Sequence, residues 1–96
     1  MVDVLIAAGA EQDYVEALAW YAERSAQAAS GFETEVERAL ESIAADPLRY
    51  PLCDKRHRFY LMQRYPFQVI YREASQGVLV VAIAHGKRRP GYWRNR

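Results

Sequence analysis

The sequence feature that most constrains the fold is an uninterrupted apolar run that ends in a cluster of positive charge. The run, Val78–Ala84, follows Gly77 and is rich in β-branched residues. A run of this kind, bounded by turn residues, predicts a buried strand at the centre of a sheet with both faces covered. His85, Gly86 and the basic residues Lys87–Arg89 come directly after it. Their side chains would stand at the exit of a rigid element, where they can be held against a partner.

Length and composition indicate one globular domain spanning residues 1–96. Apolar residues make up 51% of the chain, which is enough for a core without disulfides or a metal. The single cysteine, Cys53, cannot form an internal disulfide and fits a reducing compartment. The N-terminal segment 1–6 is too short to span a membrane and has an acid where a signal peptide carries basic residues. We therefore expect a soluble cytoplasmic protein with no membrane partner.

The net charge of +1 conceals a strong polarity along the chain. Residues 1–46 contain ten acidic and two basic residues, whereas residues 47–96 contain two acidic and eleven basic residues. A concentrated basic half can form a local positive face that attracts phosphate or an acidic polypeptide. Cys53, His57 and His85 lack the spacing of a structural zinc site, so we expect neither a metal nor a cofactor.

Hydrophobic periodicity predicts an α+β fold with elements in the order β-α-α-β-β-β. The expected elements are a strand at 2–7, helices at 10–24 and 25–45, and strands at 58–63, 67–72 and 78–85. The last three strands should form an antiparallel meander, and the two helices should pack as a hairpin on a small twisted antiparallel sheet. Residues 90–96 would form a tail, flexible except where its aromatic rings dock.

Most large apolar residues of the expected helices recur at helical spacing and are therefore assigned to the core. These are Tyr14, Tyr21, Phe32, Val36, Leu40 and Ile43. Trp20 lies off that stripe, so it is a candidate contact for a partner protein or a second copy.

A set of motifs spans nearly the whole chain: Asp13, Trp20-Tyr21, Pro47, Tyr50-Pro51, Arg58, Arg64-Tyr65-Pro66-Phe67, Ile70-Tyr71 and Ile83–Arg89. In this order and at this chain length, these motifs resemble the RelE/ParE toxins of type II toxin–antitoxin modules, also described as plasmid stabilisation proteins. The resemblance implies a bacterial toxin that is silenced by a cognate antitoxin, whose extended C-terminal segment wraps around it. The molecular target differs between branches of this family.

One branch consists of ribosome-dependent mRNA interferases, endoribonucleases in which a ribose 2′-OH attacks the adjacent phosphorus. In that case the catalytic candidates would be His85, Arg88 and Tyr92, with the ribosome and mRNA as partners. His85 would transfer protons because its ordinary pKa lies near neutrality. Arg88 and Arg89 would clamp the phosphate, and Tyr92 would stack on a base or donate a proton.

The sequence departs from that branch on the strand at 67–72, where Gln68 stands in place of a phosphate-binding arginine. Phe59 and Leu61 stand near the places of two catalytic lysines. The pattern is closer to the ParE-like branch, thought to inhibit DNA gyrase by binding. The candidate target-binding residues are Arg58, Arg64, Lys87, Arg88, Arg89 and Trp93. A small basic nucleic-acid-binding module is a further alternative.

Overall fold

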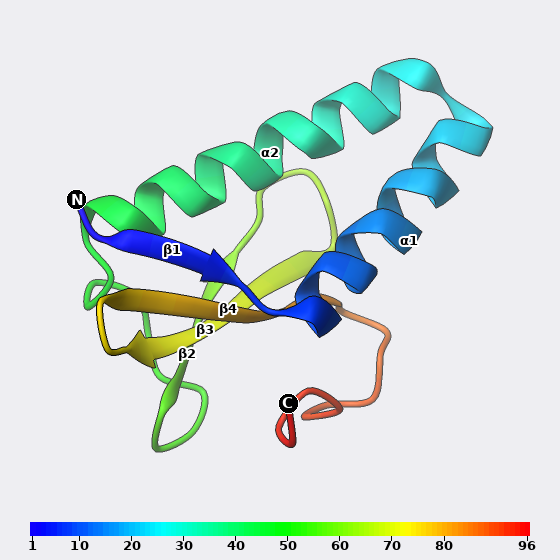
Figure 1. The fold of residues 1–96 in the computed structure, drawn as a ribbon. Helices are drawn as coiled ribbons and strands as arrows, with labels where there is room; N and C mark the ends of the chain where they lie inside the picture. Colours follow the sequence, from blue (N-terminus) through cyan, green and yellow to red (C-terminus); the bar gives the residue numbers. More distant parts are fainter.

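The computed structural model describes residues 1–96, and its elements follow the predicted order (Figure 1). The elements are β1 (Asp3–Ile6), α1 (Ala8–Arg24), α2 (Ala26–Ala45), β2 (His57–Leu61), β3 (Phe67–Ala74) and β4 (Gly77–His85). Expected and observed boundaries differ by at most two residues at any end.

The two helices form a hairpin whose turn is set by Ser25. The Ser25 side chain accepts a hydrogen bond from the backbone N–H of Ala28 at 3.1 Å and so caps α2. Its own backbone N–H donates to the carbonyl of Tyr21, which closes α1. One side of α2 is buried against the sheet at helical spacing, as predicted, through Ala29, Phe32, Val36, Ala39 and Ile43.

The four strands form one sheet in the order β1-β4-β3-β2. The β2–β3 and β3–β4 pairs are antiparallel, which confirms the predicted meander. β1 pairs parallel to β4, so the sheet is mixed rather than wholly antiparallel. The parallel pairing brings the end of β1, and therefore the start of α1, beside the middle of β4. There the N–H of Ala7 donates to the carbonyl of Val80 at 2.9 Å.

β4 is an interior strand with Val78 and Val80–Ala84 buried, as its apolar sequence predicts. Its pairing with β3 shifts register, because Tyr71 pairs with Val80 while Ile70 pairs with Ala82. Val81 is thus an extra residue, as in a β-bulge. Past the bulge the alternation of faces changes, so Ile83 returns to the side covered by the helices.

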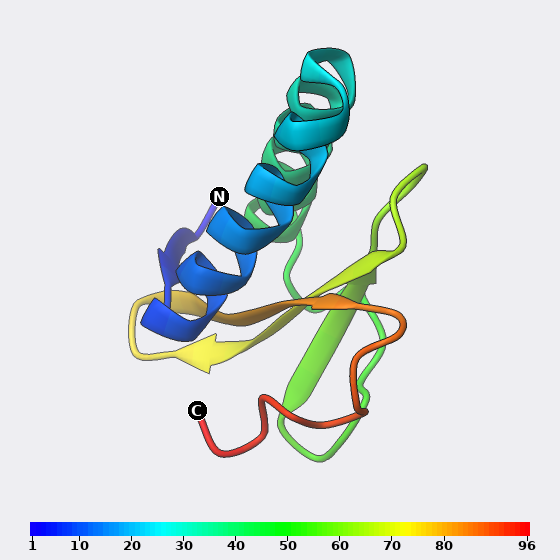
Figure 2. The same ribbon diagram turned by 90° about the vertical axis from the view of Figure 1, so that its right-hand side faces the viewer.

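The sheet has two differently covered faces (Figure 2). The helices pack on one face over a core of twelve buried residues that includes Phe32, Phe67 and Tyr71. The other face carries a cluster of five, among them Ile70, Val81 and Trp93, and is covered by the segment that follows β4. Neither helix is long and apolar enough to cross a membrane.

Candidate functional site

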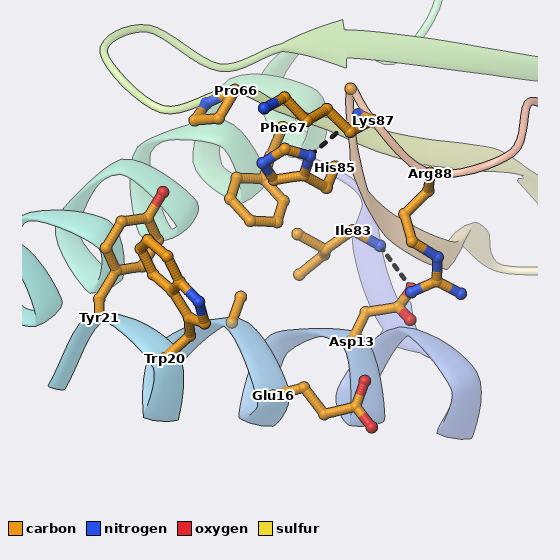
Figure 3. Close-up of a pocket in the computed structure, with 12 residues that line it drawn as sticks. Asp13, Glu16, Trp20, Tyr21, Pro66, Phe67, Ile83, His85, Lys87 and Arg88 are labelled. Atoms are coloured by element: carbon orange, nitrogen blue, oxygen red, sulfur yellow. Dashed lines mark hydrogen bonds between the residues drawn. The ribbon is translucent and has the colours of Figure 1, made fainter. Parts of the chain in front are cut away.

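A groove of about 700 Å³ lies between α1 and the end of β4 (Figure 3). The residues that line it are Asp13, Glu16, Ala17, Trp20 and Tyr21 from α1, Pro66 just before β3 and Phe67 at its start, and Ile83, His85, Gly86, Lys87 and Arg88 from the chain around the end of β4. In Figure 3, Trp20 and Tyr21 stand at one end, whereas Asp13, Glu16 and Arg88 stand at the other. The groove therefore has an aromatic end and a charged end.

The aromatic end presents Trp20 to solvent. This residue is 53% exposed, and its ring packs edge-on against Tyr21, with centroids 5.1 Å apart. The guanidinium of Arg24 lies 3.7 Å from the centroid of the Trp20 ring, so one face of the indole is covered by a cation. A large, half-exposed aromatic ring at the mouth of a groove is the type of residue that is enriched in protein interfaces.

His85 stands at the centre of the groove with its orientation fixed. Its Nδ1 accepts a hydrogen bond from the backbone N–H of Lys87 at 2.9 Å, and its ring meets Phe67 edge-on at 4.9 Å between centroids. With the Nδ1 lone pair occupied, the neutral imidazole carries its proton on Nε2. In this arrangement the Nδ1 lone pair of His85 is already engaged within the loop that follows β4.

At the charged end, Asp13 is a buried carboxylate with a side chain only 4% exposed. Its Oδ2 accepts hydrogen bonds from the backbone N–H of Ile83 at 3.1 Å, the hydroxyl of Tyr92 at 3.1 Å and Nη1 of Arg96 at 2.8 Å. The same Arg96 nitrogen donates to the carbonyl of Val81 at 3.0 Å. Asp13 therefore connects α1, the bulged part of β4 and residues far along the chain.

Two arginines lie close to the Tyr92 ring. The guanidinium carbon of Arg88 is 3.9 Å from the Tyr92 ring centroid and that of Arg96 is 5.0 Å from it. Burial, followed by the charge of Asp13 and the hydrogen bond to it, raises the pKa of Tyr92 to about 12. The hydrogen bond to Asp13 likewise raises the pKa of Arg96. The phenol is thus a protonated anchor, and its hydroxyl is already engaged.

A smaller cavity of about 210 Å³ lies on the other side of the loop after β4 and shares His85 and Arg88 with the groove. Gln68, Arg89 and Arg94 also line it. Gln68 pairs with Ala84 across the sheet, one residue before His85. Gln68, the residue by which the sequence departs from the mRNA-cleaving branch, is therefore part of the same site.

Trp93 is buried, with 5% of its surface exposed, although the sequence suggested it as a target-binding residue. Its ring packs edge-on against His57, with centroids 4.8 Å apart. Asp54 supports this contact by accepting from the His57 backbone N–H at 2.7 Å and its Nδ1 at 3.0 Å. Hydrogen bonds, first from the backbone of Arg56 and then from His57, hold the pKa of Asp54 at about 2. Arg94 Nε lies 3.6 Å from the same carboxylate.

Asp54 and Asp13 together hold residues 90–96, which the sequence suggested as a flexible tail, in a series of turns packed against the protein. The structure brings together most of the predicted site residues, namely His85, Lys87, Arg88, Arg89 and Tyr92, with Trp93 packed beneath them. No three His, Cys, Asp or Glu side chains come close enough together to hold a metal ion.

Two predicted binding residues lie elsewhere. Arg58 is on β2, and its Nη1 donates to the carbonyl of Tyr50 at 2.7 Å, which gives it a structural partner. Arg64, with φ +70°, lies in the loop before β3 and lines a separate pocket against α2. Neither residue lines the groove or the smaller cavity.

Sequence reasoning missed the role of Asp13 and Arg96. The available signal was a charged residue within the apolar stripe of α1: Asp13 falls three residues after Ala10 and four before Ala17, on the same side of the helix. Arg96 carried no such signal, because nothing in the local sequence connects it to α1.

The fold and site together define a small α+β protein with a helical hairpin, a mixed sheet and an anchored basic segment beside a groove. Among solved structures, this architecture matches "Chromosomal ParDE TA system from P. aeruginosa" with a TM-score of 0.76. The match covers 88% of this chain and 96% of the other at 13% sequence identity, which shows a shared fold.

The family model described as "ParE toxin of type II toxin-antitoxin system, parDE" matches residues 4–90. The chain therefore belongs to the ParE toxin family of type II toxin–antitoxin systems. A search of the curated proteins found no match.

Proposed function

We propose that this ParE-family toxin acts by binding DNA gyrase and blocking it, without breaking a covalent bond. The observation that carries the proposal is the anchoring of basic side chains around the groove. Arg88 packs on Tyr92, whose hydroxyl donates to Asp13. Guanidinium groups held in this way suit the recognition of carboxylates or phosphates, since less side-chain entropy is lost on binding.

The chemistry of the same residues disfavours the alternative, a ribosome-dependent mRNA endoribonuclease. His85 would have to accept the 2′ proton, yet its Nδ1 is occupied by the Lys87 N–H. Tyr92, with a pKa of about 12 and its hydroxyl bonded to Asp13, is a poor acid for a leaving oxygen. Gln68 supplies a neutral amide where the charge that builds up on phosphorus would need a cation.

We further infer that a cognate antitoxin neutralises the toxin by occupying the groove. The aromatic end offers the exposed Trp20 ring, and Phe67 adds apolar surface to the groove. Lys87 and Arg88 add positive charge at its rim, which suits an antitoxin segment that carries both apolar and acidic residues. Occupation of the groove would cover Arg88 and so block the proposed target site.

A supercoiling assay with purified gyrase tests the proposed target. The toxin is titrated into the reaction, and the same preparation is added to a translating extract in which mRNA integrity is followed. We expect supercoiling to stop while the message stays intact. Unimpaired supercoiling together with cut mRNA would contradict the proposal and favour the endoribonuclease.

The third alternative, a nucleic-acid-binding module, is tested with plain duplex DNA. A module of that kind would lose affinity steeply with salt, with log affinity falling by about 0.9 per phosphate contacted for each unit of log salt. We expect no such tight, salt-dependent binding in the absence of gyrase.

The antitoxin site is tested with Trp20→Ala. We expect this change to weaken antitoxin binding by a factor of about 30 or more, since a buried interface tryptophan contributes about 2 kcal/mol or more. Leu61→Ala is the matched control, because Leu61 is 64% exposed and lies at the end of β2, outside the groove. Equal binding by both variants would place the antitoxin elsewhere.

A further inference from the structure

The buried carboxylate of Asp13 connects three parts of the chain: α1, the edge of β4 and the segment that follows β4. β1 pairs with β4 only as far as Val80, so the next stretch of that edge of β4 lacks a strand partner. Asp13 accepts from the N–H of Ile83, and Arg96 donates to the carbonyl of Val81. The Asp13–Arg96 ion pair thus replaces the missing strand, and it couples this edge to the segment that follows β4.

The arrangement requires a negative charge and not merely a polar group. Four donor contacts converge on the two oxygens: Oδ2 receives three, and Oδ1 receives Nη2 of Arg96 at 3.3 Å. An asparagine has one acceptor oxygen and would direct its N–H₂ group at some of these donors. A carboxylate that is buried with one cationic partner and satisfied by hydrogen bonds is stable, whereas its removal leaves the partner unpaired.

The contacts of Asp13 extend to the basic side chains of the proposed target site through Tyr92. The Tyr92 hydroxyl is bound to Asp13 and its ring lies 3.9 Å from the guanidinium of Arg88. Arg88 in turn lines both the groove and the smaller cavity. The position of Arg88 therefore depends on where Tyr92 is held.

We propose that Asp13 is a positioning residue of this toxin, which holds Tyr92 and Arg96 and thereby fixes Arg88 for target binding. Asp13 acts through these residues and does not itself contact the target. The inference rests on the proposed function for its last step, the binding of gyrase, while its first steps concern only the toxin.

The test compares Asp13→Asn with Glu11→Gln in the otherwise unchanged protein. Both variants remove one negative charge from α1, but Glu11 is exposed in the first turn, and its side chain has no hydrogen bond or ion pair to the segment after β4. Three quantities are measured: amide hydrogen exchange of residues 92–96, the NMR shifts of the Arg88 side chain, which the Tyr92 ring current perturbs, and inhibition of supercoiling.

For Asp13→Asn we expect amide exchange to accelerate at least about tenfold and inhibition to weaken by a similar factor, as for loss of a charge-assisted hydrogen bond. The Arg88 resonances should move to the values of an unstacked side chain. Glu11→Gln should behave as the unchanged protein. A merely structural link between α1 and β4 would not shift the Arg88 resonances.

Unchanged Arg88 resonances in Asp13→Asn would overturn the proposal. Arg88 resonances at unstacked values together with full inhibition of supercoiling would also overturn it. If the unchanged protein leaves gyrase active, the proposed function fails, but exchange and NMR still decide whether Asp13 positions Arg88. Tyr92→Phe serves if Asp13→Asn does not fold, because it keeps the ring and the Ile83–Asp13 bond and removes only the hydroxyl. In Tyr92→Phe the Arg88 resonances should likewise move to the values of an unstacked side chain. Arg88 resonances that keep their stacked values would overturn the proposal.

Discussion

The two faces of the sheet are stabilised by different physical means. On the helix side, the twelve-residue core is dominated by packed aromatic and branched side chains, and the Phe32 ring alone packs against those of Tyr14, Tyr21, Tyr65 and Phe67. On the opposite side, a smaller cluster of five buried residues consists of four from the sheet and Trp93, which comes from the short irregular segment covering that face. Two carboxylates, Asp13 and Asp54, hold that segment in place.

This difference separates the part of the molecule that stabilises the fold from the part that presents the candidate site. Burial of apolar area on the helix side is non-directional and large, so it sets the overall stability. The contacts of the segment after β4 are few and directional, and such segments open locally at lower cost than the core. We therefore expect the candidate site to be perturbed by changes that leave the fold intact.

The largest effect is expected from Phe32→Ala on the helix side. This change removes a fully buried ring from the centre of the aromatic cluster and leaves a cavity. The free energy of unfolding, measured by urea denaturation, should fall by about 3 to 5 kcal/mol. Val15→Ala, at an exposed position of α1, should change it by less than about 0.5 kcal/mol. Similar values for the two variants would contradict a dominant helix-side core.

A smaller effect is expected from Trp93→Ala on the opposite face. The segment after β4 should detach while the helices and sheet stay folded, so the loss of stability is limited by local opening to below about 3 kcal/mol. Limited proteolysis should cut after Arg88 or Arg94 in this variant and spare the unchanged protein. If Trp93→Ala unfolds the protein as completely as Phe32→Ala does, the two faces do not differ as described.

The smallest effect is expected at acidic pH, where the contribution of Asp54 to the stability of the protein is lost. The folded protein holds the pKa of Asp54 at about 2, against an ordinary value of 3.8. Between these values unfolding takes up a proton, so the contribution of Asp54 to stability is complete above about pH 4 and is lost as pH falls toward 2. The stability difference between the unchanged protein and Asp54→Asn should shrink over that range. A difference that is independent of pH would show that the carboxylate charge plays no part.

The sequence was sufficient to predict the helices and strands, because each buries a periodic stripe or a continuous run of apolar residues. Phe32 and Ile43 on α2, and Val80 on β4, are buried as their spacing indicates. The parallel pairing of β1 was not predicted, since the direction of a short strand depends on the path of the helices between it and β4.

The sequence was less informative about the candidate site. His85 and the basic residues after it were found because they end a buried strand. The role of Asp13 depends on contacts with residues 70 to 83 positions away in the sequence, which no local pattern encodes. Arg58 carried the same positive charge as Arg88, yet it lies on β2, where it donates a hydrogen bond to the carbonyl of Tyr50 in the connection between α2 and β2.

The most direct test of the account is a comparison of supercoiling inhibition by three forms of the toxin: the unchanged protein, Arg88→Ala and Arg49→Ala. Arg88 is the anchored arginine of the proposed site, whereas Arg49 is an exposed arginine in the connection before β2. We predict that Arg88→Ala weakens inhibition by about tenfold or more, while Arg49→Ala inhibits like the unchanged protein. Equal inhibition by all three forms, or none by any, would contradict the account.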